Sequence, residues 1–155
     1  MTKLCSDVLT ALAGKTLVTA ESLTGGGIGA ALTAVPGSST VYKGGIISYT
    51  NAVKETVLGV SHETLETFGA VSVQTAEEMA VGARKLLHAD VAVSVTGLAG
   101  PGGDDFGNCV GTVCIGFSNA WKSFAVKYHF EGDREAVRHQ TIQAALELVL
   151  DNNQQ

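Results

Sequence analysis

Apolar and polar positions along the chain follow two periods, one typical of helices and one typical of strands. Apolar residues three or four positions apart predict helices over residues 4–12, 28–35, 51–58, 61–68, 75–87 and 133–148. Short apolar or β-branched runs predict strands over residues 17–19, 41–49, 91–95, 110–117 and 121–129. Because strands and helices alternate, the chain is predicted to be α/β. The hairpin expected at Ser118-Asn119 makes the sheet mixed rather than purely parallel.

Polar residues mark where several of these helices begin. Asn51 is predicted to cap the third helix, and Asp133 is predicted to cap the last. The sequence Thr-Ala-Glu-Glu at 75–78 is typical of a capping box that opens the fifth helix. The cap at Asn51 places Lys54 in the first turn of its helix, close behind Tyr49.

The turn after the first strand is the most informative stretch of the chain. Residues 21–24 read Glu-Ser-Leu-Thr and are followed by three glycines and a helix. This arrangement puts Ser22 and Thr24 at a helix N-terminus, where unpaired N–H groups and the helix dipole favour an anion or a developing oxyanion. The glycines allow a ligand or another backbone segment to come close.

Composition narrows the class of protein. With 155 residues, 45% of them apolar and 16% charged, the chain is predicted to be a single globular domain. A net charge of −5 without a cluster of Lys and Arg argues against a nucleic-acid-binding face. No apolar run reaches membrane-spanning length, and no signal peptide is evident. Cys5, Cys109 and Cys114 contain no CxxC pair, so we expect buried thiols in a cytoplasmic protein.

Several kinds of site find little support in the sequence. Residues 25–30 satisfy the relaxed dinucleotide-binding pattern, but no acidic residue occurs between Ser22 and Lys54 to bind a ribose. No GKS or GKT follows the glycines, so a P-loop is excluded. The four histidines have no metal-ligand spacing. The sequence therefore predicts neither a metal nor a cofactor.

The acid-free span suggests a different chemistry. Lys43 and Lys54 are the local charges, so the pocket is expected to favour an anionic small molecule. Ser22 could serve as a nucleophile if Lys54 acts as its base, which requires burial to lower the lysine pKa. Spacing alone leaves the alternative that Ser22 is an N-cap and Lys54 a surface lysine.

Seven short motifs resemble the CinA C-terminal domain family, in family order and over nearly the whole chain. The motifs are AESLTGG at 20–26, GSS at 37–39, YTNAVK at 49–54, GAVS at 69–72, TGLAGP at 96–101, GTV at 111–113 and GDREAVR at 132–138. The resemblance implies a single three-layer α/β/α domain over residues 1–155, with a mixed, mostly parallel sheet. Stand-alone members are nicotinamide-nucleotide amidohydrolases, which convert nicotinamide mononucleotide to nicotinate mononucleotide and ammonia without a cofactor.

Position by position, the resemblance implies that Ser22 is the acylated nucleophile, Lys54 the general base and Tyr49 a group that orients or polarises the pair. Backbone N–H groups from Thr24 to Gly26 are expected to form the oxyanion hole. The residues expected to contact substrate are Thr24, Gly25, Gly26, Gly37, Ser38, Ser39, Asn51, Thr96, Gly97, Gly100, Arg134 and Arg138. Of these, residues 37–39, Arg134 and Arg138, together with Lys43, are candidates for the substrate phosphate, although both arginines could equally be surface charges.

Two other functions stay open at this point. One is a nucleotide-binding regulatory module without turnover, and the other is an amidase that uses the same pair of residues on another small substrate. A homo-oligomer, most simply a dimer, is expected, with a small molecule rather than a nucleic acid or a membrane as the ligand.

Overall fold

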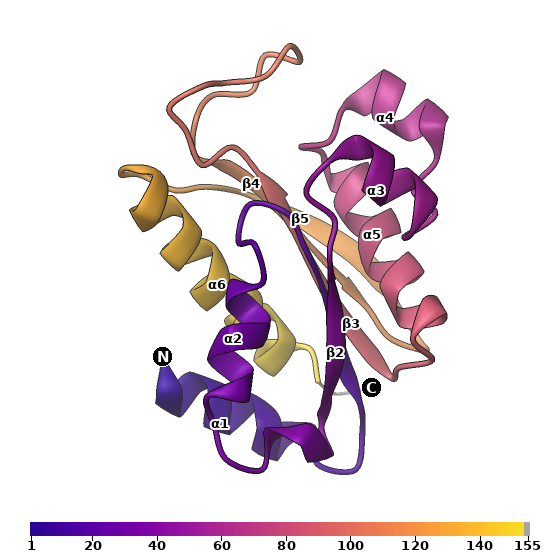
Figure 1. Ribbon diagram of the computed structural model, residues 1–155, viewed down its shortest axis with the longest axis vertical. Helices are drawn as coiled ribbons and strands as arrows, with labels where there is room; N and C mark the ends of the chain where they lie inside the picture. The colour runs from indigo at the N-terminus through magenta and orange to yellow at the C-terminus, as the bar shows by residue number, and fades with distance from the viewer. Residues whose placement is uncertain (154–155) are drawn as a thin grey trace.

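Five strands form one sheet in the order β2-β1-β3-β4-β5 (Figure 1). The structure is a computed structural model, and it describes residues 1–153. The strands are β1 (Leu17–Glu21), β2 (Tyr42–Ile47), β3 (Val91–Gly97), β4 (Thr112–Ser118) and β5 (Ser123–His129). The helices are α1 (Thr2–Ala11), α2 (Gly27–Thr33), α3 (Asn51–Thr56), α4 (His62–Phe68), α5 (Val73–Leu86) and α6 (Arg134–Asp151), with a short 3₁₀ helix η1 (Ser38–Thr40).

The sheet is mixed, as predicted, with two parallel and two antiparallel pairs of neighbouring strands. β1 pairs in parallel with both β2 and β3, whereas β4 runs antiparallel to β3 and β5 runs antiparallel to β4. Four strands therefore point in one direction, and β4 alone points in the other. The turn of the closing hairpin begins one residue later than predicted and is longer, spanning residues 119–122, because Ser118 still pairs with Ser123.

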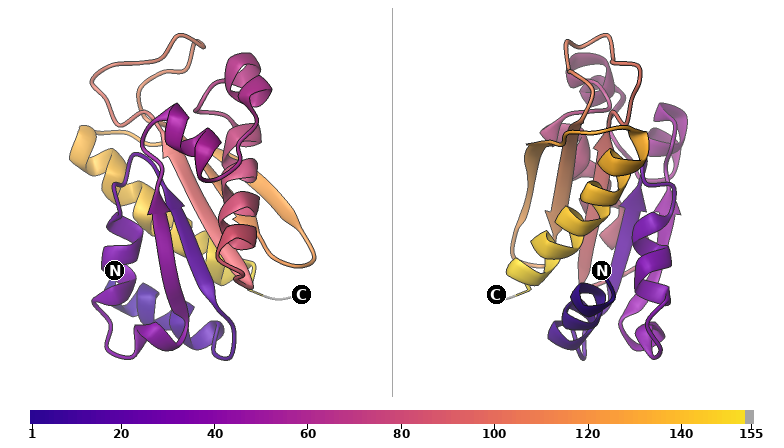
Figure 2. Two further views of the ribbon diagram at one scale, coloured as in Figure 1. Left: turned by 45° about the vertical axis from the view of Figure 1, so that its right-hand side comes forward. Right: turned by 90° about the vertical axis from the view of Figure 1, so that its left-hand side faces the viewer.

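Helices cover both faces of the sheet, which confirms the three-layer α/β/α arrangement. α1, α2 and α6 lie on one face, and α3, α4 and α5 lie on the other (Figures 1 and 2). Along β3, Val93 and Val95 face the α1/α6 layer, whereas Ala92 faces α5. α5 packs close to β4 because Gly116 leaves room for the Ala76 carbonyl, which a Cβ would strike. Among residues 1–153, no helix combines the length and the apolar character needed to cross a membrane.

The capping box predicted for α5 is wrong. The helix begins at Val73, and Ser72 is its N-cap, with Ser72 Oγ accepting the N–H of Thr75 at 3.1 Å. Thr75 is therefore inside the first turn, and its hydroxyl donates to the Gly69 carbonyl at 2.7 Å. The helix begins earlier than predicted because the Ser72 hydroxyl accepts the Thr75 N–H, one of the backbone N–H groups that the start of a helix leaves without a partner.

The structure also differs from the sequence prediction in one other N-cap residue and in the exposure of two helical side chains. Asp133 caps α6 as predicted, but Thr50 and not Asn51 caps α3, because the Thr50 hydroxyl accepts the N–H of the third helical residue at 3.4 Å. Val57 and Leu86, which belong to the apolar patterns that predict α3 and α5, are exposed. Both lie at the C-terminal ends of their helices.

Candidate active site

The carboxyl ends of three parallel strands meet at one edge of the sheet. Ser22 directly follows β1, Thr96 and Gly97 end β3, and α3 with Lys54 follows β2. β2 and β3 lie on opposite sides of β1, so the order in which the chain adds strands to the sheet reverses at β1. Such a reversal leaves a crevice at the strand ends, which is where open α/β sheets bind ligands.

Lys54 and Ser22 are in direct contact in this crevice. Lys54 Nζ lies 3.1 Å from Ser22 Oγ, 2.8 Å from the Ser48 carbonyl oxygen and 3.5 Å from the Tyr49 carbonyl oxygen. Carbonyl oxygens can only accept, whereas a hydroxyl can also donate. A neutral amine therefore fits this site well: its two hydrogens point to the carbonyls, and its lone pair accepts the Ser22 proton.

Burial favours the neutral form of this lysine. The Lys54 side chain is 1% exposed, and among residues 1–153 it has no acidic partner. Desolvation lowers the pKa of Lys54 from 10.5 to about 8. A substantial fraction of the amine is then neutral near physiological pH. The alternative that Lys54 is a surface lysine is therefore wrong.

Glu21 holds the turn that carries Ser22. Its buried carboxylate accepts the N–H groups of Ile28 at 2.9 Å and Gly29 at 3.0 Å, and the hydroxyl of Thr24 at 2.6 Å. The expectation that the N-terminus of α2 is free to bind an anion is therefore wrong, because Glu21 already occupies it. The signal was present in the sequence, since an acid just before a helix is favoured by its dipole.

The turn itself narrows the candidates for an oxyanion hole. Gly26 and not Ser22 is the N-cap of α2, and its φ of +97° requires a glycine. The N–H of Gly25 donates to the Ser22 carbonyl at 3.1 Å, so it is already paired. Within residues 1–153, the N–H groups of Leu23, Thr24 and Gly26 have no acceptor. These three remain as possible donors to an oxyanion.

Tyr49 contacts Lys54 through its backbone and not through its ring. Its side chain is 58% exposed, and its hydroxyl accepts a hydrogen bond from Arg134 at 3.1 Å. Arg134 also donates to the Gly100 carbonyl at 2.8 Å, which ties the start of α6 to the loop after β3. The predicted orienting effect of Tyr49 on Lys54 rests on its carbonyl oxygen alone.

A pocket of about 620 Å³ opens over the pair. The predicted site residues that line it are Ser22, Tyr49, Asn51, Lys54, Thr96, Gly97, Gly100 and Arg134. Sequence reasoning missed Phe106, because the loop around it has no hydrophobic period. Its ring lies against Gly69, where an added Cβ would come within 2.7 Å of it. Asp104 and Asp105 also line the pocket, so its charge is not purely positive.

The whole chain resembles known sequences and structures. Residues 1–152 match the CinA C-terminal domain. The chain belongs to the CinA C-terminal domain family. A CinA-like protein from Endomicrobium trichonymphae is 44% identical over 151 residues, covering 93% of this chain and 35% of that protein. The curated relatives are longer, and the chain spans about a third of their length.

Solved structures confirm the fold of this CinA domain. The competence/damage inducible protein CihA from Agrobacterium tumefaciens is 41% identical, with a TM-score of 0.95 and coverage of 99% of this chain and 95% of that one. A CinA superfamily protein from Enterobacter cloacae is 35% identical, also with a TM-score of 0.95, and the coverage is 99% and 92%.

Some predicted substrate contacts of the CinA domain lie away from the pocket. Gly37, Ser38 and Ser39 belong to the segment that leads into β2, at the amino ends of the parallel strands. Ser22 lies at the carboxyl ends, so the prediction that residues 37–39 join Ser22 around one substrate is wrong. Lys43 is exposed on β2 and does not line the pocket either.

Arg138 braces the Ser22 turn and does not face the pocket. Its Nε donates to the Leu23 carbonyl at 2.9 Å, and one of its terminal nitrogens donates to the Thr24 carbonyl at 3.2 Å. The prediction that Arg138 binds the substrate phosphate is therefore wrong for this pocket, because Arg138 does not line it and its guanidinium is bound to backbone carbonyls of the turn. Thr24 is buried and does not line the pocket either.

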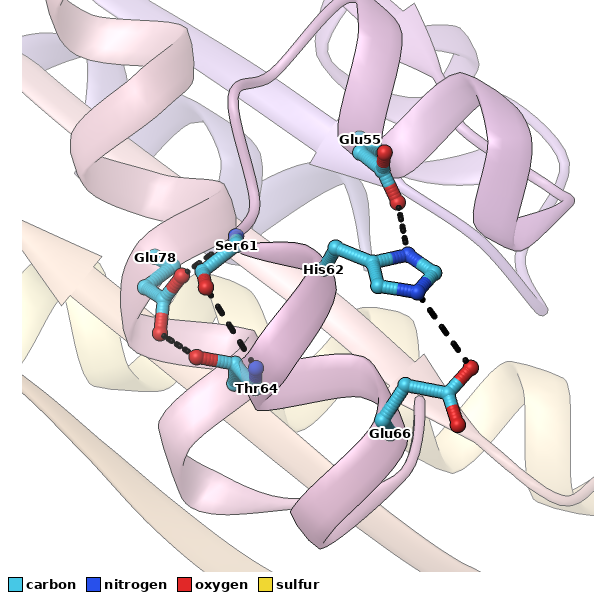
Figure 3. Close-up of polar contacts among 6 residues, drawn as sticks. All are labelled: Glu55, Ser61, His62, Thr64, Glu66 and Glu78. Carbon is cyan, nitrogen blue, oxygen red and sulfur yellow. Dashed lines mark hydrogen bonds and ion pairs between the residues drawn. The ribbon is translucent and has the colours of Figure 1, made fainter.

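Polar contacts secure the helix that carries Lys54 against its neighbours (Figure 3). Glu78 on α5 accepts the N–H of Ser61 at 2.8 Å and the hydroxyl of Thr64 at 2.6 Å, which fixes α4. His62 then links α4 to α3 through Glu55, with 3.0 Å between Nδ1 and the carboxylate. That hydrogen bond raises the pKa of His62. In residues 1–153, no three His, Cys, Asp or Glu side chains are grouped to hold a metal ion.

Proposed function

We propose that this CinA domain hydrolyses the carboxamide of nicotinamide mononucleotide to nicotinate mononucleotide and ammonia, a step in pyridine nucleotide recycling. The observation that carries the proposal is the buried Lys54 amine, held by two carbonyls with its third contact on Ser22 Oγ. A nucleophile in contact with an activated base is what amide hydrolysis through an acyl-enzyme requires.

In the first step, Lys54 takes the Ser22 proton as Oγ attacks the carboxamide carbon. The oxygen that becomes negative is stabilised by N–H groups of the turn, with Leu23 and Thr24 closest in sequence to the nucleophile. The C–N bond then breaks, and Lys54 returns the proton to the departing nitrogen, which leaves as ammonia. Water then attacks the Ser22 ester as Lys54 takes one of its protons. The ester C–O bond breaks, Ser22 Oγ recovers the proton from Lys54, and nicotinate mononucleotide is released.

Pocket size and lining support a nucleotide of this class. A volume of about 620 Å³ lies within the range of roughly 300–1,000 Å³ that is typical of small-molecule sites. The Arg134 guanidinium can pair with a phosphate in a bidentate way. The rings of Tyr49 and Phe106 offer aromatic faces to a pyridinium, whose positive charge favours such contact.

The direct test measures ammonia and nicotinate mononucleotide released from nicotinamide mononucleotide by the purified protein. We expect the two products in equal amounts, without an added cofactor. Binding of the nucleotide without turnover would contradict the proposal and favour a regulatory module. Turnover of other small amides, with nicotinamide mononucleotide neither bound nor hydrolysed, would favour an amidase for another substrate.

Activity is expected to rise with pH through the titration of Lys54. Burial lowers the pKa of Lys54 to about 8, and only the neutral amine can accept the Ser22 proton. Well below this pH, kcat/KM should therefore increase about tenfold per pH unit, and it should level off above it. Initial rates of ammonia release in overlapping buffers provide the measurement. A profile that is flat or falls between pH 7 and pH 9 would exclude Lys54 as the base.

A further inference from the structure

A second group of reactive side chains lies on the surface, outside the pocket over Ser22. Cys109 Sγ is 3.7 Å from His129 Nδ1 and 3.6 Å from the Thr112 hydroxyl, and His129 Nε2 is 3.2 Å from a Glu131 carboxylate oxygen. Cys109 is exposed, contrary to the expectation that all three thiols are buried. Cys109, His129 and Glu131 are thus linked in series, as a nucleophile, a base and a carboxylate that can orient the base.

The two ring nitrogens of His129 face partners of different character. Glu131 can only accept, so the neutral imidazole carries its hydrogen on Nε2 and donates it to the carboxylate. Nδ1 then holds the lone pair, and that lone pair faces Cys109 Sγ. This is the tautomer in which His129 can take the thiol proton, by the same logic as a nucleophile–base–carboxylate triad.

Backbone geometry holds the group in place. β4 and β5 are antiparallel and put Thr112 directly opposite His129. The Cys109 carbonyl accepts the N–H of Thr112 at 3.1 Å, which folds Cys109 back over this pair. Gly111 packs against the Phe130 carbonyl, which an added Cβ would strike, and also against the imidazole, where that Cβ would lie 3.2 Å from His129 Cε1. The contact between thiol and imidazole is therefore set by the turn and the strand register.

The group faces a surface hollow of about 390 Å³, lined by Cys109, Thr112, Lys127 and His129 among others. Lys127 adds a positive charge to the lining, which favours an anionic reagent in the hollow. The other two cysteines offer a contrast within the same chain. Cys5 and Cys114 are fully buried, and burial raises the pKa of Cys5 and raises that of Cys114 to about 11.

We propose that Cys109 is a thiol-modification site that reacts with low-molecular-weight disulfides, with His129 as its base and Glu131 as the group that orients the base. The Cys109 proton passes to His129 Nδ1, and Sγ attacks one sulfur of the disulfide. A new S–S bond forms while the original one breaks. The departing thiolate takes the proton from His129, so Cys109 is oxidised and half of the disulfide is reduced to a free thiol. This site does not depend on the amidohydrolase activity.

The test uses Ellman's reagent, an aromatic disulfide whose released thiolate is coloured, on the native protein at one fixed pH. We expect one thiol per chain to react rapidly and three to react after denaturation, with the adduct located at Cys109 by peptide mass spectrometry. Cys109→Ser should remove the rapid phase. His129→Asn should slow it by at least about tenfold, since positioned bases contribute roughly 10²–10⁴-fold and this one is exposed.

His139→Asn is the matched control, because His139 is an exposed histidine on α6 away from the hollow. It should react at the wild-type rate, and the melting temperatures of both histidine variants should match that of the wild type. A rate that is unchanged in His129→Asn would overturn the proposal, as would a native adduct found on Cys5 or Cys114.

Discussion

Replacing Ser22 with alanine is expected to lower kcat for ammonia release by at least about 10³-fold, the order of loss seen when a catalytic nucleophile is removed. Without Oγ no acyl-enzyme can form, and Lys54 Nζ loses the one partner within residues 1–153 that can donate a proton to it. The measurement is the initial rate of ammonia release from nicotinamide mononucleotide at saturating substrate, together with a search by intact-mass spectrometry for an ester in the wild type.

Ser38 provides a matched control for this substitution. Ser22 and Ser38 are both 7% exposed, so removing either hydroxyl changes a similarly buried position. Ser38 lies near the amino ends of the parallel strands, away from the pocket. Ser38→Ala is therefore expected to keep wild-type activity. Both variants should melt within about 2–3 °C of the wild type, since neither substitution creates a cavity larger than one oxygen atom. Substantial turnover in Ser22→Ala would rule out Ser22 as the nucleophile.

The order of the strands and helices could be predicted because their periods differ so clearly. Short buried runs such as 17–19 and 91–95 became the central strands β1 and β3, and the closing hairpin made the sheet mixed. Helix starts were less predictable. Thr50 and Asn51 are adjacent and both are good N-caps, so the choice depends on which residue has extended backbone angles, and the sequence does not show that.

Within the site, the sequence correctly predicted the positions of those residues whose location follows from the direction of the strands. Ser22 directly follows β1, and Lys54 lies in the helix that follows the neighbouring parallel strand β2, so their meeting follows from the fold. The same argument could have excluded residues 37–39, because a segment that precedes β2 must lie at the opposite end. Arg134 and Arg138 could not be separated in this way. They are one helical turn apart, and only the tertiary structure shows that Arg134 lines the pocket while Arg138 holds the turn.

Replacing Lys54 with methionine is expected to lower kcat/KM by about 10³-fold, within the range that general acid–base catalysis supplies. Methionine keeps an unbranched apolar stem of similar length, but it has no amine to take the Ser22 proton. The rise of activity with pH should also vanish, which a loss of fold alone would not produce. Lys43→Met is the matched control, since Lys43 is an exposed lysine outside the pocket, and its activity and pH profile should match the wild type.

The same variant should be at least as stable as the wild type at pH 7, although it is nearly inactive. A lysine with a pKa of 10.5 in the unfolded chain and about 8 in the folded one makes charged Lys54 unfavourable to bury, by about 3 kcal/mol. That cost applies in full below about pH 8 and disappears as pH rises to 10.5, so wild-type stability gains over this interval. Methionine removes the cost and gives up hydrogen bonds worth about 1 kcal/mol each.

Urea unfolding of both proteins at pH 7 and pH 10 measures the difference in the free energy of unfolding. Lys54→Met should match or exceed the wild type in stability at pH 7 and fall below it at pH 10. A wild-type stability that does not rise from pH 7 to pH 10 relative to Lys54→Met would mean that the ammonium is not buried at a cost.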